Sequence, residues 1–299
     1  MDDTYKLYKS SKEYPLWPIK EEKFTSILYG KDDISNETQV FKEEINGKLA
    51  GFISVKAKVI EGVKKGSVVF IFVDEAFRGK GVGHKLLQSG LNWFKNQRVH
   101  KIKFGGNAGS YFWPAVPENL PQLKKFLKKE NFTLSEGPVD MFADITGFTT
   151  PTNVYNALEE NGVVIEYANE EYKDSIIKFA KENFSQWYEY YLEDLTKGKF
   201  DKVFYAHKGD EIVAISELWV RDSNWDLLFE NNVGGGGALG VAEKWRGKGI
   251  GLAMKTWGTE ILKEEDIKYV WISWTSSIGF YEKLGFRIWR RYNNARLSI

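Results

Sequence analysis

The chain contains the sequence Trp245-Arg246-Gly247-Lys248-Gly249-Ile250-Gly251 between an apolar segment and a helical pattern. An Arg-x-x-Gly-x-Gly sequence at such a junction leaves backbone N–H groups unpaired at the start of the helix, where a diphosphate would fit. The glycines let the backbone turn sharply, and Arg246 and Lys248 add positive charge. One such turn is also consistent with a plain strand-to-helix connection.

A second copy of this stretch favours the functional interpretation. It reads Phe77-Arg78-Gly79-Lys80-Gly81-Val82-Gly83 and has the same flanking pattern. The two arginines, Arg78 and Arg246, lie 168 residues apart (246 − 78) in a chain of 299 residues, so each half has the size of a typical domain. We therefore predict two similar domains, 1–150 and 160–299, joined near Pro151, which disfavours helix at the residue before it.

Composition excludes several classes of protein. Hydrophobic residues make up 42% of the chain, and no apolar run is long enough to cross a bilayer. The absence of cysteine excludes disulfides, thiolate metal sites and a cysteine nucleophile, and the three histidines have no metal-ligand spacing. A net charge of +1 provides no strong electrostatic attraction for nucleic acid. We expect no metal, no nucleic-acid partner, no membrane span and, because the first residues lack a secretory pattern, a cytoplasmic location.

Periodicity in the first half predicts a helical start followed by a β-meander. Asn46-Gly47 is a strong hairpin signal between the alternating segments 38–45 and 49–59. Later segments predict a strand at 67–73, a helix at 82–97, a strand at 101–104, a helix at 121–130 and a strand at 139–145. Between them, the insert 110–117 is rich in aromatic residues and proline, and we interpret it as a rigid surface loop packed against the other domain.

The second half repeats this order. Its pattern predicts strands at 163–167, 202–207, 211–220, 238–242, 269–274 and 286–290. Helices are predicted at 170–182 and 186–195, with a further helix before and another after the strand 269–274, and the connection to about residue 162 is polar. The glycine run 234–237 precedes one of the strands and is expected either to admit a substrate against the backbone or to be a flexible loop. The fold class is therefore α+β, with a mixed, mainly antiparallel sheet flanked by helices in each domain.

A meander that ends in Arg-x-x-Gly-x-Gly, followed by a helix, a strand and a helix carrying Phe280-Tyr281-Glu282-Lys283-Leu284-Gly285-Phe286, resembles the GNAT superfamily of acetyl-CoA-dependent N-acetyltransferases. The resemblance covers nearly the whole chain as a tandem pair. The glycine run and the ending of the second copy are also similar to bacterial glucosamine and glucosaminide N-acetyltransferases associated with cell-wall sugar salvage.

The resemblance implies roles for individual residues. The loop of the second copy would hold the pyrophosphate of acetyl-CoA, the co-substrate, and the preceding strand would pair with its pantetheine arm; whether the loop of the first copy is also occupied stays open. The implied acetyl-CoA contacts are Leu239, Gly240, Val241, Arg246, Gly247, Lys248, Gly249, Ile250 and Gly251, with Arg78, Gly81 and Gly83 in the first copy. Tyr281 would donate a proton to the departing thiolate, although an aromatic residue there also packs the helix on the sheet.

The two copies differ at this acid. Aligning 126–132 with 281–286 places Phe126, which has no hydroxyl, at the position of Tyr281, with one extra residue in the first copy. The first domain is therefore expected to be degenerate. The second copy also departs from the family, since Trp274 stands where an asparagine is often found.

Direct transfer to an amine requires a base, and carboxylates near the meander are the candidates. Glu217 lies in an apolar strand, where burial would raise its pKa, and is preferred over Asp226 and Glu230. Flat aromatic faces beside polar groups suit a sugar ring, so Trp219, Asp226 and Trp274 are the candidate acceptor contacts, although core packing explains most aromatic residues.

The function expected from these features is direct N-acetylation of a primary amine in a small molecule, an amino sugar such as a glucosamine or glucosaminide of cell-wall origin. Alternative acceptors are an aminoglycoside, a polyamine or a protein amine; the near-neutral charge disfavours a strongly cationic acceptor. A different class of function is a non-catalytic module that senses CoA or binds a partner, but retention of Tyr281 in one copy argues against it.

Overall fold

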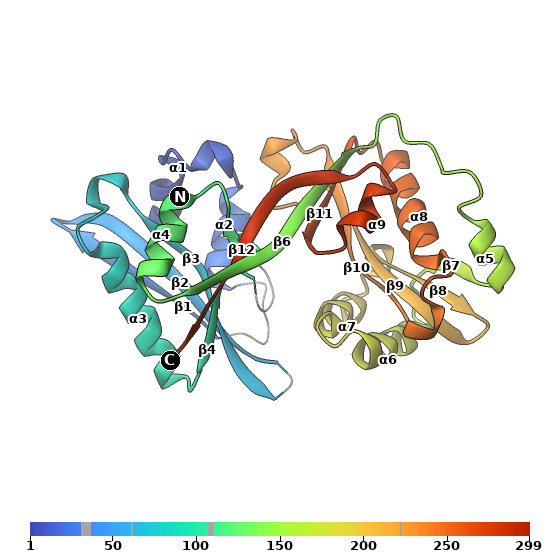
Figure 1. Cartoon of the computed structure of the whole chain (residues 1–299), viewed down its shortest axis with the longest axis horizontal. Helices are drawn as coiled ribbons and strands as arrows, with labels where there is room; N and C mark the ends of the chain where they lie inside the picture. Colours follow the sequence, from blue (N-terminus) through green and yellow to red (C-terminus); the bar gives the residue numbers. More distant parts are fainter. Residues whose placement is uncertain (31–36, 61, 107–110, 222) are drawn as a thin grey trace. The chain divides into compact units, whose positions relative to one another are not determined.

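The computed structural model describes residues 1–30, 37–60, 62–106, 111–221 and 223–299, which form two compact units (Figure 1). Unit 1 consists of Met1–Val139 and Arg290–Ile299, and unit 2 of Asp140–Trp289. These extents differ from the predicted ranges 1–150 and 160–299, because the division falls before the connection around Pro151 and the last ten residues belong to unit 1.

Unit 1 begins with two helices and a meander, as its periodicity predicts. Its elements are α1 (Asp3–Lys9), α2 (Glu21–Tyr29), β1 (Glu37–Ile45), β2 (Lys48–Ile60), β3 (Val63–Val73), α3 (Val82–Asn96), β4 (Lys101–Phe104), β5 (Val116–Pro117), α4 (Pro121–Lys129) and the first part of β6 (Thr133–Asp144). The hairpin turn is at Asn46-Gly47, where both residues have positive φ, 51° and 72°, as a two-residue turn between twisted strands requires.

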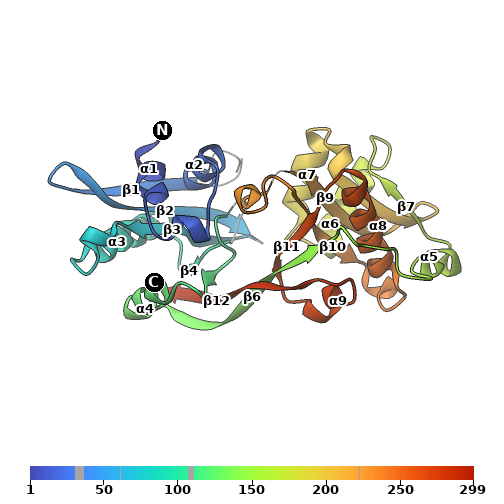
Figure 2. The same cartoon turned by 90° about the horizontal axis from the view of Figure 1, so that it is seen from above.

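The sheet of unit 1 is mixed and mainly antiparallel. Strands β1, β2 and β3 form the antiparallel meander, β3 pairs with β4 in parallel, and β4 pairs with the end of β12 (Arg287–Ser298). Figure 2 shows α1 and α2 on one face of this sheet and α3 on the other. Apolar side chains such as Phe52, Phe70 and Leu87 are buried between these layers and form the core.

Unit 2 repeats the order of unit 1. Its elements are α5 (Asn156–Asn161), β7 (Val164–Tyr167), α6 (Lys173–Asn183), α7 (Tyr188–Thr196), β8 (Val203–Lys208), β9 (Glu211–Val220), β10 (Val233–Val241), α8 (Ile250–Glu264), β11 (Tyr269–Thr275) and α9 (Ile278–Glu282), with the first part of β12. Strands β7 to β10 pair antiparallel, and β10 pairs with β11 in parallel. The α+β prediction of tandem, similar sheets is confirmed.

Three features of unit 2 differ from the sequence prediction. The strand expected at 238–242 begins at Val233, so the glycine run is part of β10, and the predicted flexible loop is wrong. A short helix, α5, lies in the connection, where none was expected. The last strand, expected at 286–290, continues as β12 to Ser298. No helix among the described residues has the length and apolarity needed to span a membrane.

Candidate active site

The loop that connects β10 to α8 has the backbone of an anion-binding site. Gly247 and Gly249 have φ of 77° and 82°, and their counterparts Gly79 and Gly81 have 76° and 84°, conformations that favour glycine. Gly249 is the N-cap residue of α8 and makes no side-chain capping hydrogen bond. The first N–H groups of α8 therefore lack a side-chain cap and, with the positive end of the helix dipole, suit a phosphate.

The arginine that both loops share has a structural role in each. Arg246 Nε donates a hydrogen bond to the carbonyl of Val241 at 3.1 Å, and Arg78 Nε donates to that of Val73 at 2.9 Å. Each arginine thus ties its loop to the end of the preceding strand. The remaining guanidinium N–H groups decide what else the loop can bind.

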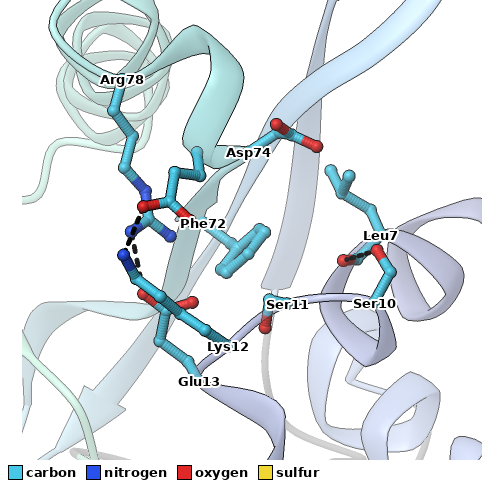
Figure 3. A pocket seen from close by; sticks show the side chains of 9 residues that line it. Leu7, Ser10, Ser11, Lys12, Glu13, Phe72, Asp74 and Arg78 are labelled. Carbon is cyan, nitrogen blue, oxygen red and sulfur yellow. Dashed lines mark hydrogen bonds and ion pairs between the residues drawn. The ribbon is translucent and has the colours of Figure 1, made fainter.

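The two arginines differ in the partners of their remaining guanidinium N–H groups. Arg78 Nη1 forms an ion pair with Glu13 Oε1 at 2.8 Å, beside a cavity of about 160 Å³ where Lys12 also pairs with Glu75 (Figure 3). Within the described part of the chain, Arg246 has no carboxylate partner. The charge of Arg78 is therefore neutralised by unit 1 itself, while that of Arg246 remains available for a ligand.

Beyond the loop, β10 and β11 diverge. Their parallel pairing ends at Gly235 and Trp271, whereas β10 stays paired with β9 as far as Val241 and Ala214. We call this divergence the fork. The arm of the fork after Gly235 includes Leu239 and has a backbone edge not paired with β11, which an extended ligand can occupy by strand addition.

A bulge lies in this arm of the fork. The pairing register of β10 shifts between Gly237 and Gly240, and Ala238 has a φ of 47°. Tyr191 of α7 donates its hydroxyl hydrogen bond to the carbonyl of Ala238 at 2.6 Å, which fixes the bulge from the α7 side. Nothing local in the sequence indicates that Tyr191 contacts this carbonyl.

The glycines of β10 make room for bulky neighbours. A Cβ added at Gly235 would lie 2.3 Å from the Trp219 ring, and one added at Gly240 would lie 2.5 Å from the Phe184 ring. Neither contact is possible for a residue with a side chain unless the ring moves. The run thus allows aromatic rings to lie directly on the strand, which is a packing role rather than a flexible one.

Glu217 and Trp219 share one face of β9, because alternate residues of a strand point to the same side. Glu217 is half-buried, its Oε1 is shielded from solvent, and this oxygen has no hydrogen-bond partner in the described parts of the structure. Burial raises the pKa of Glu217 to about 8; Asp194 raises it further, while Lys202 and Lys199 oppose the shift. A carboxylate with this pKa can exchange protons near neutral pH.

Trp271 adds a hydrogen-bond donor on this face. Its ring is buried 6.3 Å from that of Trp219, centroid to centroid, at 74°. The indole N–H has no acceptor among the residues that the structure describes. An unpaired buried donor and the unpaired Glu217 oxygen are costly unless a polar ligand satisfies them. Because Trp271 reads as an ordinary strand residue, its sequence alone does not indicate this role.

The other two predicted acceptor contacts lie in different settings. Asp226 is buried in a short turn, and its Oδ1 accepts a hydrogen bond from the Ser223 backbone at 2.9 Å, so it shapes the loop before β10. Trp274, near the end of β11, is 36% exposed with a φ of 54°, and its backbone N–H donates to Asp140 at 3.0 Å. Of the three predicted acceptor contacts, only Trp219 is on the same face of the same strand as Glu217.

Tyr281 lies in α9 with only 8% of its surface exposed. Burial raises the pKa of Tyr281 to about 12, so its hydroxyl remains protonated at any working pH. Its ring packs at 5.7 Å from that of Phe286, and its carbonyl accepts a hydrogen bond from the Phe286 N–H at 3.3 Å. A buried, protonated phenol can act as a proton donor.

Unit 1 places a different residue at this position. The N–H of Phe132 bonds to the carbonyl of Leu127 at 2.9 Å, in the pattern of Phe286 and Tyr281. Gly83 lies beside the Phe126 ring, as Gly251 lies beside that of Phe280. Leu127, not Phe126, is therefore the counterpart of Tyr281, and the alignment needs no extra residue. Unit 1 still lacks the hydroxyl.

The insert of unit 1 is buried rather than exposed. Phe112 and Trp113 pack on Phe70, with ring centroids 4.6 and 5.1 Å apart, so the predicted surface loop is wrong for these two residues, which belong to the core of unit 1. The predicted first residue of the insert, Ser110, lies outside the described residues. Counted from the matching loops, Phe70 corresponds to Ala238 in the bulge of unit 2. Aromatic rings thus fill the face of unit 1 that remains partly polar in unit 2.

The base candidate is also absent from unit 1. Strand pairing makes Ser54 the counterpart of Glu217, and its hydroxyl donates to the carbonyl of Leu28 at 2.6 Å. Unit 1 thus retains neither of the two candidate proton-transfer residues of unit 2. Across the described ranges of both units, no cluster of three or more histidine, aspartate or glutamate side chains is arranged to hold a metal ion.

Comparison with known proteins agrees with this geometry. Residues 1–111 and 164–286 match the model of the acetyltransferase (GNAT) family. No curated protein matches the chain. The chain is similar to a structure described as a GCN5-related glucosamine N-acetyltransferase region of a fungal multi-domain GH3 β-N-acetylglucosaminidase, with a TM-score of 0.91 and 22% identity. That match covers 99% of this chain and 37% of the longer fungal protein.

Two further structures share the fold. A tandem GNAT protein from the clavulanic acid biosynthesis pathway has a TM-score of 0.63 and 14% identity, covering 89% of this chain and 84% of its own. A GCN5-related N-acetyltransferase from Sphaerobacter thermophilus has a TM-score of 0.61 and 16% identity, covering 85% and 78%.

Proposed function

Because the chain belongs to the GNAT family of acetyltransferases, we propose that unit 2 transfers an acetyl group from acetyl-CoA directly to a primary amine. The observation that carries this proposal is the fork, which leaves an unpaired backbone edge next to the loop at Arg246. Unit 1 has the same loop but neither the acid nor the base. The chemistry is therefore assigned to unit 2 alone.

The donor is held by backbone groups and one available charge. The N–H groups of Gly247 to Gly251 and the guanidinium of Arg246 face the pyrophosphate. Leu239, Gly240 and Val241 pair with the pantetheine arm along the fork. This assignment is supported by the unpaired edge of β10 and by the absence of a carboxylate partner for Arg246 among the described residues.

Proton transfer is assigned to two residues on different elements. Glu217 takes a proton from the acceptor ammonium, directly or through water, so that the neutral amine attacks the thioester carbonyl. As the carbon–sulfur bond breaks and the amide bond forms, Tyr281 Oη donates its proton to the departing sulfur. The raised pKa values of both groups support these directions of proton transfer. The first step requires a base whose pKa is near neutrality, and the second requires a protonated phenol.

The acceptor we propose is an amino sugar, such as a glucosamine or glucosaminide of cell-wall origin. Its ring would lie on Trp219, and its hydroxyl groups would satisfy the Trp271 N–H and the oxygen of Glu217, both unpaired among the described residues. An aliphatic polyamine has no hydroxyl groups to do this. The fungal structure described as a glucosamine N-acetyltransferase region supports the same class. Asp226 and Trp274 would act as more distant acceptor contacts.

Unit 1 is proposed to be a scaffold without activity. Phe70, Phe112 and Trp113 fill the face that would receive an acceptor, and Glu13 neutralises Arg78. Its loop, including Gly81 and Gly83, keeps the backbone of a phosphate site but lacks the charge that unit 2 offers. We therefore expect one acetyl-CoA per chain.

The experiment that tests this function is acetyl-CoA consumption by the purified chain with a panel of amines. Glucosamine, chitosan oligomers, an aminoglycoside, spermidine and a lysine peptide are offered in parallel, and CoA release is followed at neutral pH. Turnover confined to amino sugars supports the proposal. Turnover with another amine would change the proposed acceptor but would still support an acetyltransferase. Acetyl-CoA binding without any turnover across the panel favours the sensing module instead.

A further inference from the structure

Lys255 is a buried lysine in the middle of α8. Only 4% of its surface is exposed, and its ammonium group has no ion pair or hydrogen bond with any described residue. Burial lowers the pKa of Lys255 to about 7, with no charged neighbour contributing. Its Nζ lies over the Phe286 ring, 5.3 Å from the centroid. An amine with little access to solvent and no carboxylate beside it is unfavourable, and a polar ligand would stabilise it.

The amine points at the start of the fork. A Cβ added at Gly236 would lie 3.3 Å from Lys255 Nζ, and Gly236 is the first residue of β10 after its pairing with β11 ends. On another side, Nζ contacts Phe286, whose ring packs against that of Tyr281. Lys255 Nζ therefore lies between the apex of the fork and the residues around the proposed acid.

Unit 1 has apolar residues at both positions. Counting from the matching loops, the counterpart of Lys255 is Leu87 and that of Gly236 is Val68, and both are buried. Leucine and valine pack the helix on the strand with no polar atom to satisfy. Unit 2 has instead a glycine, which weakens a strand, and an amine, which is unfavourable when buried. Both substitutions occur in the unit with the acid and the base.

We propose that Lys255 is an acyl-site residue, whose Nζ donates a hydrogen bond to the carbonyl oxygen of the acyl thioester at the apex of the fork. This inference rests on the proposed function, which places the thioester in the fork. Gly236 leaves the space through which the amine reaches the carbonyl. The same contact strengthens as negative charge develops on that oxygen during attack by the amine.

The test compares two ligands that differ only in the acyl group. Calorimetry measures binding of acetyl-CoA and of CoA to the wild type and to Lys255→Met, which keeps the length of the side chain without its donor. We expect the variant to bind acetyl-CoA about 10-fold or more weakly and CoA unchanged, since only acetyl-CoA has the carbonyl. Lys255→Gln, which retains a donor, should recover part of the difference.

Controls separate this inference from folding and from the proposed function. Lys263→Met changes a lysine of the same helix whose Nζ bonds to the Phe148 carbonyl, and should leave both affinities unchanged. Removal of an unpaired buried amine should keep or raise the melting temperature. Equal affinities of wild type and Lys255→Met for acetyl-CoA, or equal losses for both ligands, overturn the role of Lys255. A wild type that binds neither ligand overturns the proposed function itself.

Discussion

Leu127 occupies in unit 1 the position that Tyr281 occupies in unit 2, since each accepts at its carbonyl the N–H of a phenylalanine five residues later, Phe132 or Phe286. Asn131 and Gly285, which precede these phenylalanines, both have positive φ, at 65° and 79°. The backbone has thus kept one turn in both copies, while the side chain that could donate a proton is present in only one.

Tyr281→Phe should remove the acid without disturbing the packing, because Leu127 shows that the position tolerates an apolar residue. We expect kcat to fall by roughly 10²-fold, with the affinity for acetyl-CoA near that of the wild type. Steady-state kinetics and calorimetry measure the two quantities. Tyr167→Phe, in the exposed strand β7, is the matched control. An unchanged kcat in Tyr281→Phe would remove this residue from its role.

Glu217→Gln should lower activity and raise stability together. As the base, Glu217 must be ionised, so the wild-type rate should rise with pH through about 8. The variant should have a kcat that is lower by roughly 10²-fold or more, and its rate should no longer rise with pH in this range. In the unfolded chain the carboxyl loses its proton near its ordinary pKa, whereas the folded chain keeps it up to about 8. The folded state therefore binds more protons in this window, and stability falls as pH rises through it.

The amide that Glu217→Gln introduces would have no such pH-dependent cost. Thermal unfolding should show a variant that is more stable than the wild type at pH 8, by a few degrees, with a smaller advantage near pH 5. Asp194, Lys199 and Lys202, whose charges act on the carboxyl, are the same in both proteins, so the comparison isolates the carboxyl itself. A variant of full activity, or one that is less stable at pH 8, would contradict the assignment.

The two loops can be compared by the same substitution. Gly81→Ala and Gly249→Ala introduce a side chain at φ of 84° and 82°, so the backbone strain should be similar. Gly249→Ala should also collide with Ala157, which lies 2.7 Å from the added Cβ. We expect KM for acetyl-CoA to rise about 10-fold or more in Gly249→Ala only. A comparable rise in Gly81→Ala would show that unit 1 contributes to donor binding.

Much of the fold follows from local sequence. The loops at Arg78 and Arg246, the Asn46-Gly47 turn and the period of each helix depend on residues that are neighbours in the chain, so periodicity and turn chemistry indicate them. The strand containing 234–237 is less predictable, because glycine has a low strand propensity. The Trp219 ring, which requires a glycine at 235, lies on another strand.

The site was less predictable than the fold for the same reason. Glu217 and Tyr281 were found from an apolar strand and a motif, respectively. The sequence does not indicate Lys255, and it indicates Tyr191 and Trp271 only as aromatic residues, since what distinguishes all three is a contact or a missing partner that only the folded chain reveals. The shift by one residue between Phe126 and Leu127 also required the hydrogen bonds of the turn.

The contact between Trp219 and Gly235 provides the last prediction. If Trp219 supports the acceptor ring, Trp219→Leu should raise KM for the amino sugar about 10-fold and leave KM for acetyl-CoA unchanged. Gly235→Ala should do the same indirectly, because its Cβ would displace the indole. Since the second change acts through the first residue, the double variant should be no worse than Trp219→Leu alone. Additive losses in this double-mutant cycle would mean that Gly235 has a separate role, and an unchanged acceptor KM in Trp219→Leu would remove the tryptophan from the acceptor site.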